Sequence, residues 1–169
     1  YGLDHDNFIG KTIQKNNLEL DGLVFFREHR IRFQQELARK TRGLPKSIDK
    51  RLDLFCEKLG SLLNLNDEKP ALLHGDLWSG NYFASHDQKP YIFDPAVYFG
   101  LREADLAMTE MFGRLPQEFY STYQEVFPTQ PGYTERKDIY NLYHLLNHYN
   151  LFGGSYLEQA DQTVRCFLD

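Results

Sequence analysis

Residues 71 to 93 break the helical spacing that runs through most of the sequence, and this change restricts the possible folds most. The segment contains apolar runs too short for helices, separated by Gly, Pro and polar residues. This pattern predicts strands at 71–74, 81–84 and 91–93, with 85–90 as the turn between the last two. Strands this short cannot build a large sheet. The sequence therefore predicts an α+β, mostly helical domain with a small β insertion at its centre.

Helical periodicity flanks this insertion on both sides. Helices are expected at about 23–41, after Pro45, at 104–111, from near Pro116, at 139–149 and at 155–168. In the second of these, one apolar stripe runs from Ile48 to Leu62, and Ser47 is the expected N-cap because its hydroxyl can accept from a first-turn amide. Gly113 and the Gly153-Gly154 pair are the expected helix stops.

Size and composition predict one globular domain over residues 1–169. The chain has 41% hydrophobic residues and a formal net charge of −5, and this charge argues against a broad electrostatic contact with nucleic acid. It contains no apolar run of about 18 residues, so no membrane span is expected. Its two cysteines, Cys56 and Cys166, are too few for a disulfide framework. We expect both to be buried thiols and the protein to be cytoplasmic.

The residues that carry chemistry lie inside the insertion. His74, Asp76 and Asn81 form an H-x-D-x-x-x-x-N loop, and Asp94 follows thirteen residues later. Phosphoryl transfer needs a carboxylate to accept the proton of the nucleophile and oxygen ligands for Mg²⁺ on the nucleotide phosphates. Asp76 is predicted to be the base, and Asn81 and Asp94 the metal ligands. The predicted hairpin places Asp76 before its first strand and Asp94 after its second, so both carboxylates can face one cleft.

A purely structural alternative exists for this loop. Asn and Asp side chains often bond to the backbone of turns, so His74 and Asp76 could serve the loop alone while Asn81 caps a turn. For His74 this structural role is the favoured interpretation. For the complete set with Asp94, phosphoryl transfer is favoured.

Longer stretches resemble the fructosamine kinase (ketosamine 3-kinase) family, which is related to aminoglycoside and choline kinases and more distantly to protein kinases. The matching stretches are His5 to Gly10, Val24 to Ile31, HGDLWSGN at His74 to Asn81, Phe93 to Met108, Met111 to Tyr123 and Leu142 to Tyr156. They cover nearly the whole chain, and HGDLWSGN is far more specific than the bare kinase loop. The resemblance implies ATP and Mg²⁺ as cofactors, Asp76 as base, and Asn81 and Asp94 as cofactor and metal ligands.

The resemblance also implies the C-terminal lobe of a protein-kinase-like (aminoglycoside phosphotransferase-like) fold. No Gly-rich phosphate loop with a strand Lys precedes His74, and Lys11 is not a convincing substitute. The chain begins with Tyr1 and not with Met, so we expect it to be part of a longer protein. Its N-terminal nucleotide-binding lobe is then the missing partner, and these residues alone are predicted to have no kinase turnover.

The implied substrate is a small-molecule or protein-bound ketosamine. Trp78, Tyr98 and Phe99 flank the loop among few acids, and aromatic faces suit a sugar joined to one amine better than a polycation. For Trp78, packing is an equally good explanation. The alternatives are an aminoglycoside, choline or other small-metabolite kinase, and an inactive binding module that lacks the N-terminal lobe.

Several other polar residues have two explanations. Glu103 and Asp105 begin a helix, where acids are stabilised by free amides, and the resemblance makes Asp105 a support for the catalytic loop with Arg102 as its partner. His144 and His148 have a zinc-like spacing, but no third ligand is identifiable, so polar packing is favoured; their helix could line the acceptor side of the cleft. His5, Asp6 and Asn7 are expected near the lobe junction, and their chemistry is not readable from the sequence.

Overall fold

A computed structural model describes residues 1–65 and 68–168. Helices account for most of these residues, as the sequence predicts. They are α1 (Gly22–Phe25), the π-helix η1 (Phe26–Arg32), α2 (Phe33–Thr41), α3 (Lys46–Leu63), α4 (Glu103–Met111), α5 (Gln117–Val126), α6 (Tyr133–Phe152) and α7 (Tyr156–Leu168). The first three run on without a break, so the expected helix at 23–41 is confirmed. None of the helices in the described part of the chain is long and apolar enough to cross a membrane.

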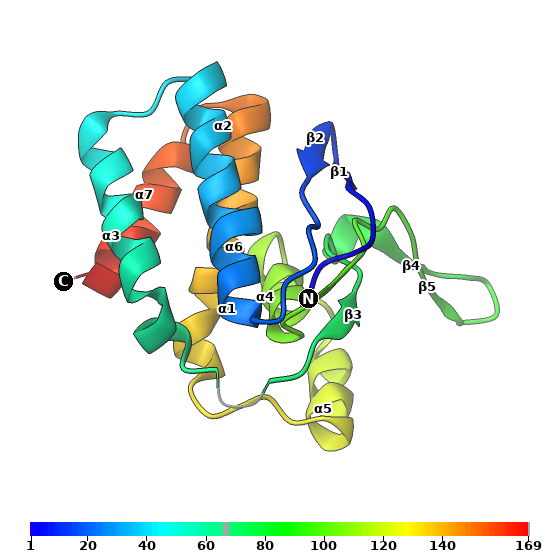
Figure 1. Cartoon of the computed structure of the whole chain (residues 1–169). Helices are drawn as coiled ribbons and strands as arrows, with labels where there is room; N and C mark the ends of the chain where they lie inside the picture. Colours follow the sequence, from blue (N-terminus) through cyan, green and yellow to red (C-terminus); the bar gives the residue numbers. More distant parts are fainter. Residues whose placement is uncertain (66–67, 169) are drawn as a thin grey trace.

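Helix α6 lies at the centre of the helical part. It packs against α2, α4 and α7, while α3 packs against α7 (Figure 1). Its buried apolar residues recur at helical spacing, for example Ile139, Leu142 and Leu146, all fully buried. Polar residues, among them His144 and Asn147, are buried on the same helix. The core and the polar lining of the site therefore share one helix.

The strands form three separate two-stranded antiparallel sheets. They are β1 (Asn7–Ile9) with β2 (Thr12–Gln14), β3 (Ala71–Leu73) with β6 (Tyr98–Gly100), and β4 (Tyr82–Ala84) with β5 (Pro90–Ile92). The predicted strands and the hairpin turn between the last two are confirmed within a residue or two. Strands β1, β2 and β6 were not predicted from the sequence. All three sheets lie on one side of the helices (Figure 1).

Two local predictions are wrong. Helix α3 begins at Lys46 directly after Pro45, so Ser47 lies inside its first turn and is not the N-cap. Proline suits this position because its fixed φ and missing N–H cost a helix start nothing. A side-chain cap occurs instead at α1, where Asp21 accepts from the amides of Leu23 and Val24. Cys56 is buried as expected, but Cys166 is exposed on α7.

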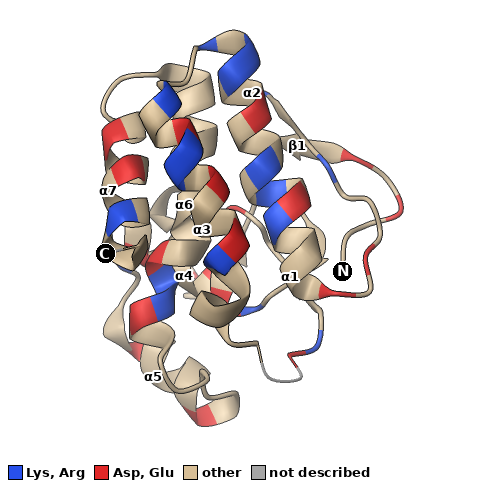
Figure 2. Cartoon of the chain, turned by 60° about the vertical axis from the view of Figure 1, so that its left-hand side comes forward, with Lys and Arg blue, Asp and Glu red and all other residues tan. Residues whose placement is uncertain are grey.

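Lysine and arginine residues alternate with acids on the surfaces of α2 and α3 (Figure 2). Arg39 pairs with Asp49 at 2.7 Å and with Asp53 at 3.3 Å, which connects the two helices. The charges on this face are therefore largely paired with one another.

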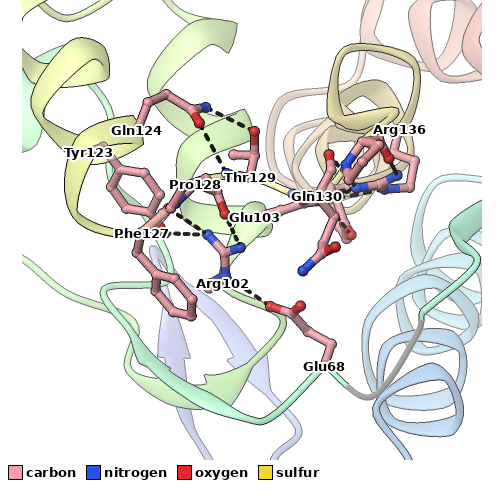
Figure 3. A network of polar contacts seen from close by, with 12 residues as sticks. Glu68, Arg102, Glu103, Tyr123, Gln124, Phe127, Pro128, Thr129, Gln130 and Arg136 are labelled. Carbon is pink, nitrogen blue, oxygen red and sulfur yellow. Dashed lines mark hydrogen bonds and ion pairs between the residues drawn. The ribbon is translucent and has the colours of Figure 1, made fainter.

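The start of α4 is held by two oppositely charged neighbours (Figure 3). Arg102 lies 3.1 Å from a carboxylate oxygen of Glu68 and donates to the carbonyls of Phe127 and Pro128 after α5. Its guanidinium also lies 3.9 Å from the ring centre of Phe127. Arg102 is therefore not the partner of Asp105, and that expectation is wrong.

Glu103 faces the other way, toward α6. Its carboxylate accepts two bonds of 2.9 Å from Arg136 and one of 3.1 Å from the Tyr140 hydroxyl. The backbone amide of Gln130 donates to the same group. A buried ion pair with this many hydrogen bonds offsets its own desolvation.

Replacing Arg136 with Met should leave the Glu103 carboxylate buried without its charge partner. We expect a loss of about 3 kcal/mol in the free energy of unfolding, measured by urea denaturation. The control is Arg165→Met, which removes an exposed partner of Asp161 and should cost less than about 1 kcal/mol. Equal losses in the two variants would contradict this account.

Candidate active site

The loop after β3 turns sharply at Gly75. This residue has φ +81°, and a Cβ here would overlap the carbonyl oxygen of Ala96. Only glycine fits such a close approach with a positive φ. The turn directs the chain from β3 at the helical core to Asp76 at the edge of a cavity.

Asp105 on α4 holds this turn. One of its carboxylate oxygens accepts from the His74 amide at 2.7 Å and the other from the Gly75 amide at 2.9 Å. Burial raises the pKa of Asp105. The predicted support role therefore has a direct geometric basis in two backbone bonds.

His74 connects the two halves of the site. Its Nε2 lies 2.9 Å from the Phe93 carbonyl, and its Nδ1 lies 3.3 Å from the Asp76 amide. A carbonyl only accepts and an amide only donates, so the ring is neutral with its proton on Nε2. His74 thus ties the residue before Asp94 to the backbone of Asp76, as expected for a residue that supports the loop.

Asn81 lies against Asp76. Its Nδ2 donates to the backbone carbonyl of Asp76 at 2.9 Å and to Oδ2 at 3.2 Å. These bonds assign the amide orientation and leave the Oδ1 atom with no bond to the described residues. The Phe93 amide donates to the carbonyl of Asn81, so the residue preceding Asp94 is fixed beside this group.

Asp94 follows β5 in an unusual backbone conformation. Its φ is +54°, its side chain is exposed, and no ion pair with a residue of the described chain involves it. An amide oxygen and a free carboxylate are ligands that Mg²⁺ accepts. Asn81 and Asp94 therefore fit a cation site by the chemistry of their donors.

The environment of Asp76 suits a proton acceptor. Burial raises the pKa of its carboxyl, and the charge of Asp94 adds a smaller contribution in the same direction. A carboxylate with a raised pKa is a stronger base toward a hydroxyl. The structure thus brings together Asp76, Asn81 and Asp94, of which the first and last lie eighteen positions apart in the sequence.

A cavity of about 410 Å³ opens beside Asp76. It is lined by Ile9, Gly10, Asp76, Trp78, Met108, Phe112, Asn147, His148, Leu151, Phe152 and Tyr156. Asp76 is the one acid among these residues. A second cavity of about 450 Å³ lies between α4, α6 and α7, and no residue of the loop motif reaches it.

Aromatic rings form a continuous wall of the first cavity. Trp78 packs edge-on against Phe112 at 6.1 Å between ring centres, and Phe112 lies 5.0 Å from His148. Tyr156 lies 5.1 Å from the other side of His148. Trp78 therefore both packs against a neighbour and lines the cavity, so its two interpretations are compatible.

The other two aromatic residues expected near the acceptor do not reach it. Tyr98 is 3% exposed and lies under the guanidinium of Arg30, 3.9 Å from the ring centre. Phe99 is exposed on β6, outside the cavity lining. Strand alternation explains the difference, because neighbouring residues of β6 face opposite sides.

His144 and His148 have different environments. His144 is buried, and burial lowers its pKa to about 3. His148 lines the cavity, and its Nδ1 lies 2.8 Å from the His144 carbonyl one turn back, so Nδ1 carries the proton. No group of three or more His, Cys, Asp or Glu residues that could hold a metal occurs in residues 1–65 and 68–168. His144 is packed in the core, while His148 contributes to the cavity.

Several lining residues were not predicted. The sequence suggested α6 as the acceptor side, but Phe112, Asn147 and Tyr156 looked like ordinary core positions. The turn of the β1–β2 hairpin at Gly10 was also missed as a cavity wall. No local signal distinguishes such residues, because four segments that are distant in the sequence form this lining.

Replacing Asp105 with Asn should leave one of the two loop amides unpaired, since the NH₂ group cannot accept. We expect a loss of about 1–3 kcal/mol in the free energy of unfolding, measured in urea. Asp4→Asn, which changes an exposed acid, is the control and should have almost no effect. An unchanged stability in Asp105→Asn would show that the two bonds do not hold the loop.

Comparisons with known proteins give one consistent family. The family model described as fructosamine kinase matches residues 1–169, the whole chain. A Vibrio parahaemolyticus protein named "probable ketoamine kinase" is 50% identical over 164 residues, which are 97% of this chain and 55% of that relative. An Oryza sativa subsp. indica protein, named protein-ribulosamine 3-kinase, chloroplastic, is 44% identical over 168 residues, which are 99% of this chain and 48% of the relative.

The fold is similar to solved structures as well. A crystal structure described as a candidate fructosamine-3-kinase from Thermobifida fusca superposes with a TM-score of 0.91 at 32% identity. The match covers 99% of this chain and 58% of that one. The chain thus spans about half the length of the relatives it matches.

Proposed function

The chain belongs to the fructosamine kinase family, and we propose that it is the catalytic lobe of an ATP-dependent kinase that phosphorylates a sugar hydroxyl of ketosamines. One observation carries this proposal. Asp76, with Asn81 on one side and the Asp94 segment on the other, is the one acid in an aromatic cavity of about 410 Å³. The proposal agrees with the names of the relatives and solved structures.

In the proposed reaction, the acceptor hydroxyl lies in the cavity and donates a hydrogen bond to Asp76. The carboxylate orients the hydroxyl oxygen and takes its proton as the bond to the γ-phosphorus forms, while the bond from that phosphorus to the β-phosphate oxygen breaks and ADP leaves. The Asn81 amide donates to Oδ2 of Asp76, which steadies the carboxylate and leaves its other oxygen for the acceptor. Asn81 and Asp94 would hold Mg²⁺, which would neutralise charge on the nucleotide phosphates.

We place the nucleotide between this lobe and an N-terminal lobe of the complete protein. The length of the relatives allows for such a lobe, since the chain spans about half of them. Large apolar side chains are exposed next to Asp94 on the β4–β5 hairpin, and their exposed fractions are 50% for Phe83, 63% for Ile92 and 45% for Phe93. Apolar surface of this kind commonly contacts a ligand or another domain.

The cavity suits a ketosamine better than the alternative acceptors. An aminoglycoside carries several positive charges, and the single carboxylate of Asp76 cannot pair with them all. Choline has one hydroxyl, whereas the cavity lining offers several polar side chains, namely Asp76, Asn147, His148 and Tyr156. A sugar supplies neighbouring hydroxyls for such a lining.

The variant Asp76→Asn should distinguish the role of a base from the role of a metal ligand. In the complete protein we expect kcat to fall roughly 10²-fold or more, the scale of a lost general base, with Mg·ATP affinity nearly unchanged. Asp94→Asn is the matched variant, and it should weaken the Mg²⁺ dependence of nucleotide binding because a charged ligand becomes neutral. Steady-state kinetics with calorimetric nucleotide titrations measures both. The reverse pattern would mean that Asp94 is the base and Asp76 the metal ligand.

The substrate assignment is tested by competition. The complete protein is offered a fructosamine or ribulosamine, a kanamycin-type aminoglycoside and choline together with ATP. We expect the ketosamine to be phosphorylated preferentially, on the third carbon of the sugar, with the position determined by phosphorus and carbon NMR. Preference for the aminoglycoside or choline would overturn the substrate assignment and leave the kinase assignment intact.

A further inference from the structure

The β1–β2 hairpin has no role in the proposed reaction, although its first strand, β1, belongs to one of the stretches that resemble the family. Ile9 and Gly10 at its turn line the acceptor cavity. At its other end, Gln14 is 1% exposed and packed against the segment that follows Asp94. The hairpin therefore contacts the acceptor cavity at one end and, at the other end, the segment that follows Asp94.

Two side-chain amides of the hairpin bind consecutive carbonyls in that segment. The Nδ2 of Asn7 donates to the Val97 carbonyl at 2.8 Å, and the Nε2 of Gln14 donates to the Ala96 carbonyl at 2.9 Å. Gln14 also donates to Asn7 at 2.8 Å and accepts from the Tyr143 hydroxyl on α6 at 2.9 Å. Each amide is thereby fixed in orientation by a partner outside the segment.

Asp94 needs such support because of its backbone. A residue other than glycine is uncommon in the left-handed region and persists there where its surroundings hold it. On the N-terminal side, His74 holds the Phe93 carbonyl. On the C-terminal side, the Ala96 amide donates to the His74 carbonyl, while Ala96 and Val97 offer their carbonyls to the hairpin.

We propose that Asn7 and Gln14 are positioning residues for Asp94, which hold its carboxylate in place for the cation that it shares with Asn81. The inference rests on the proposed function for the identity of that cation as nucleotide-bound Mg²⁺. Neither hairpin residue touches the cation or the acceptor. Both act through the backbone of residues 94–97, where the carbonyls they hold come two and three residues after Asp94.

The informative variant is Gln14→Glu. The carboxylate keeps the bond accepted from Tyr143 and loses both donated bonds, to Asn7 and to Ala96. The control is Gln35→Glu, an equally buried glutamine that donates to Asp49 and Asp53 between α2 and α3, away from the site. Both variants should lower thermal stability, so stability alone does not decide the matter.

Two measurements on the complete protein decide it. Mn²⁺ replaces Mg²⁺ in an electron paramagnetic resonance titration with ADP, and Gln14→Glu should bind it roughly tenfold more weakly than wild type, as for other groups that orient a metal ligand. Hydrogen exchange of residues 93–98 should be faster in Gln14→Glu only. Gln35→Glu should match wild type in both measurements. Wild-type Mn²⁺ affinity and exchange in Gln14→Glu would overturn the proposal.

A second variant covers the case in which Gln14→Glu does not fold. Asn7→Asp loses the bond to Val97 and keeps those accepted from Gln14 and Asn16, at a less buried position. It should show the same two changes, and wild-type behaviour would again refute the positioning role. If wild type itself binds no Mn²⁺ with ADP, the proposed function fails, whereas the exchange measurement still tests whether the hairpin holds residues 93–98.

Discussion

Asp105 accepts hydrogen bonds from two consecutive backbone amides, and the site depends on these two bonds. The turn at Gly75 points the amides of His74 and Gly75 away from any strand, and unpaired amides in this partly buried position would destabilise it. Asp105 can pair with both because α4 begins two residues earlier, at Glu103, and presents the carboxylate from its first turn. The position of the proposed base therefore depends on the position of one helix end.

The start of α4 is fixed from two sides by the charged side chains of two adjacent residues, Arg102 and Glu103. Arg102 binds the chain after α5 and Glu68, and Glu103 binds Arg136 on α6. These two adjacent residues carry opposite charges and form ion pairs with different parts of the chain (Figure 3). Helix α4 can therefore neither slide nor rotate without breaking a buried ion pair. A buried network of ion pairs outside the lining of the acceptor cavity thus contributes to the geometry at Asp76.

The parts predicted from sequence are those that local spacing determines. The loop from His74 to Asn81 and the hairpin before Asp94 are each contiguous, so residue types and turn signals were enough to bring Asp76 and Asn81 together. The acceptor cavity is different, because Gly10, Phe112 and His148 come from segments whose neighbourhood only tertiary packing decides. Tyr98 illustrates the same limit. Its burial follows from a fully buried Arg30, which no pattern around Tyr98 reveals.

His74 gives the site a rigidity that the proposed phosphoryl transfer would require. In that proposal, in-line attack would need the acceptor oxygen, held by Asp76, and the phosphoryl group, held through a cation at Asn81 and Asp94, to meet within a fraction of an ångström. Asp76 and Asp94 belong to different loops, and independent motion of these loops would change that distance directly. The imidazole bonds to the Asp76 amide on one edge and to the Phe93 carbonyl on the other, so the two loops share one rigid ring. A neutral histidine is suited to this place because it accepts at one nitrogen and donates at the other, while protonation would break the bond to Asp76.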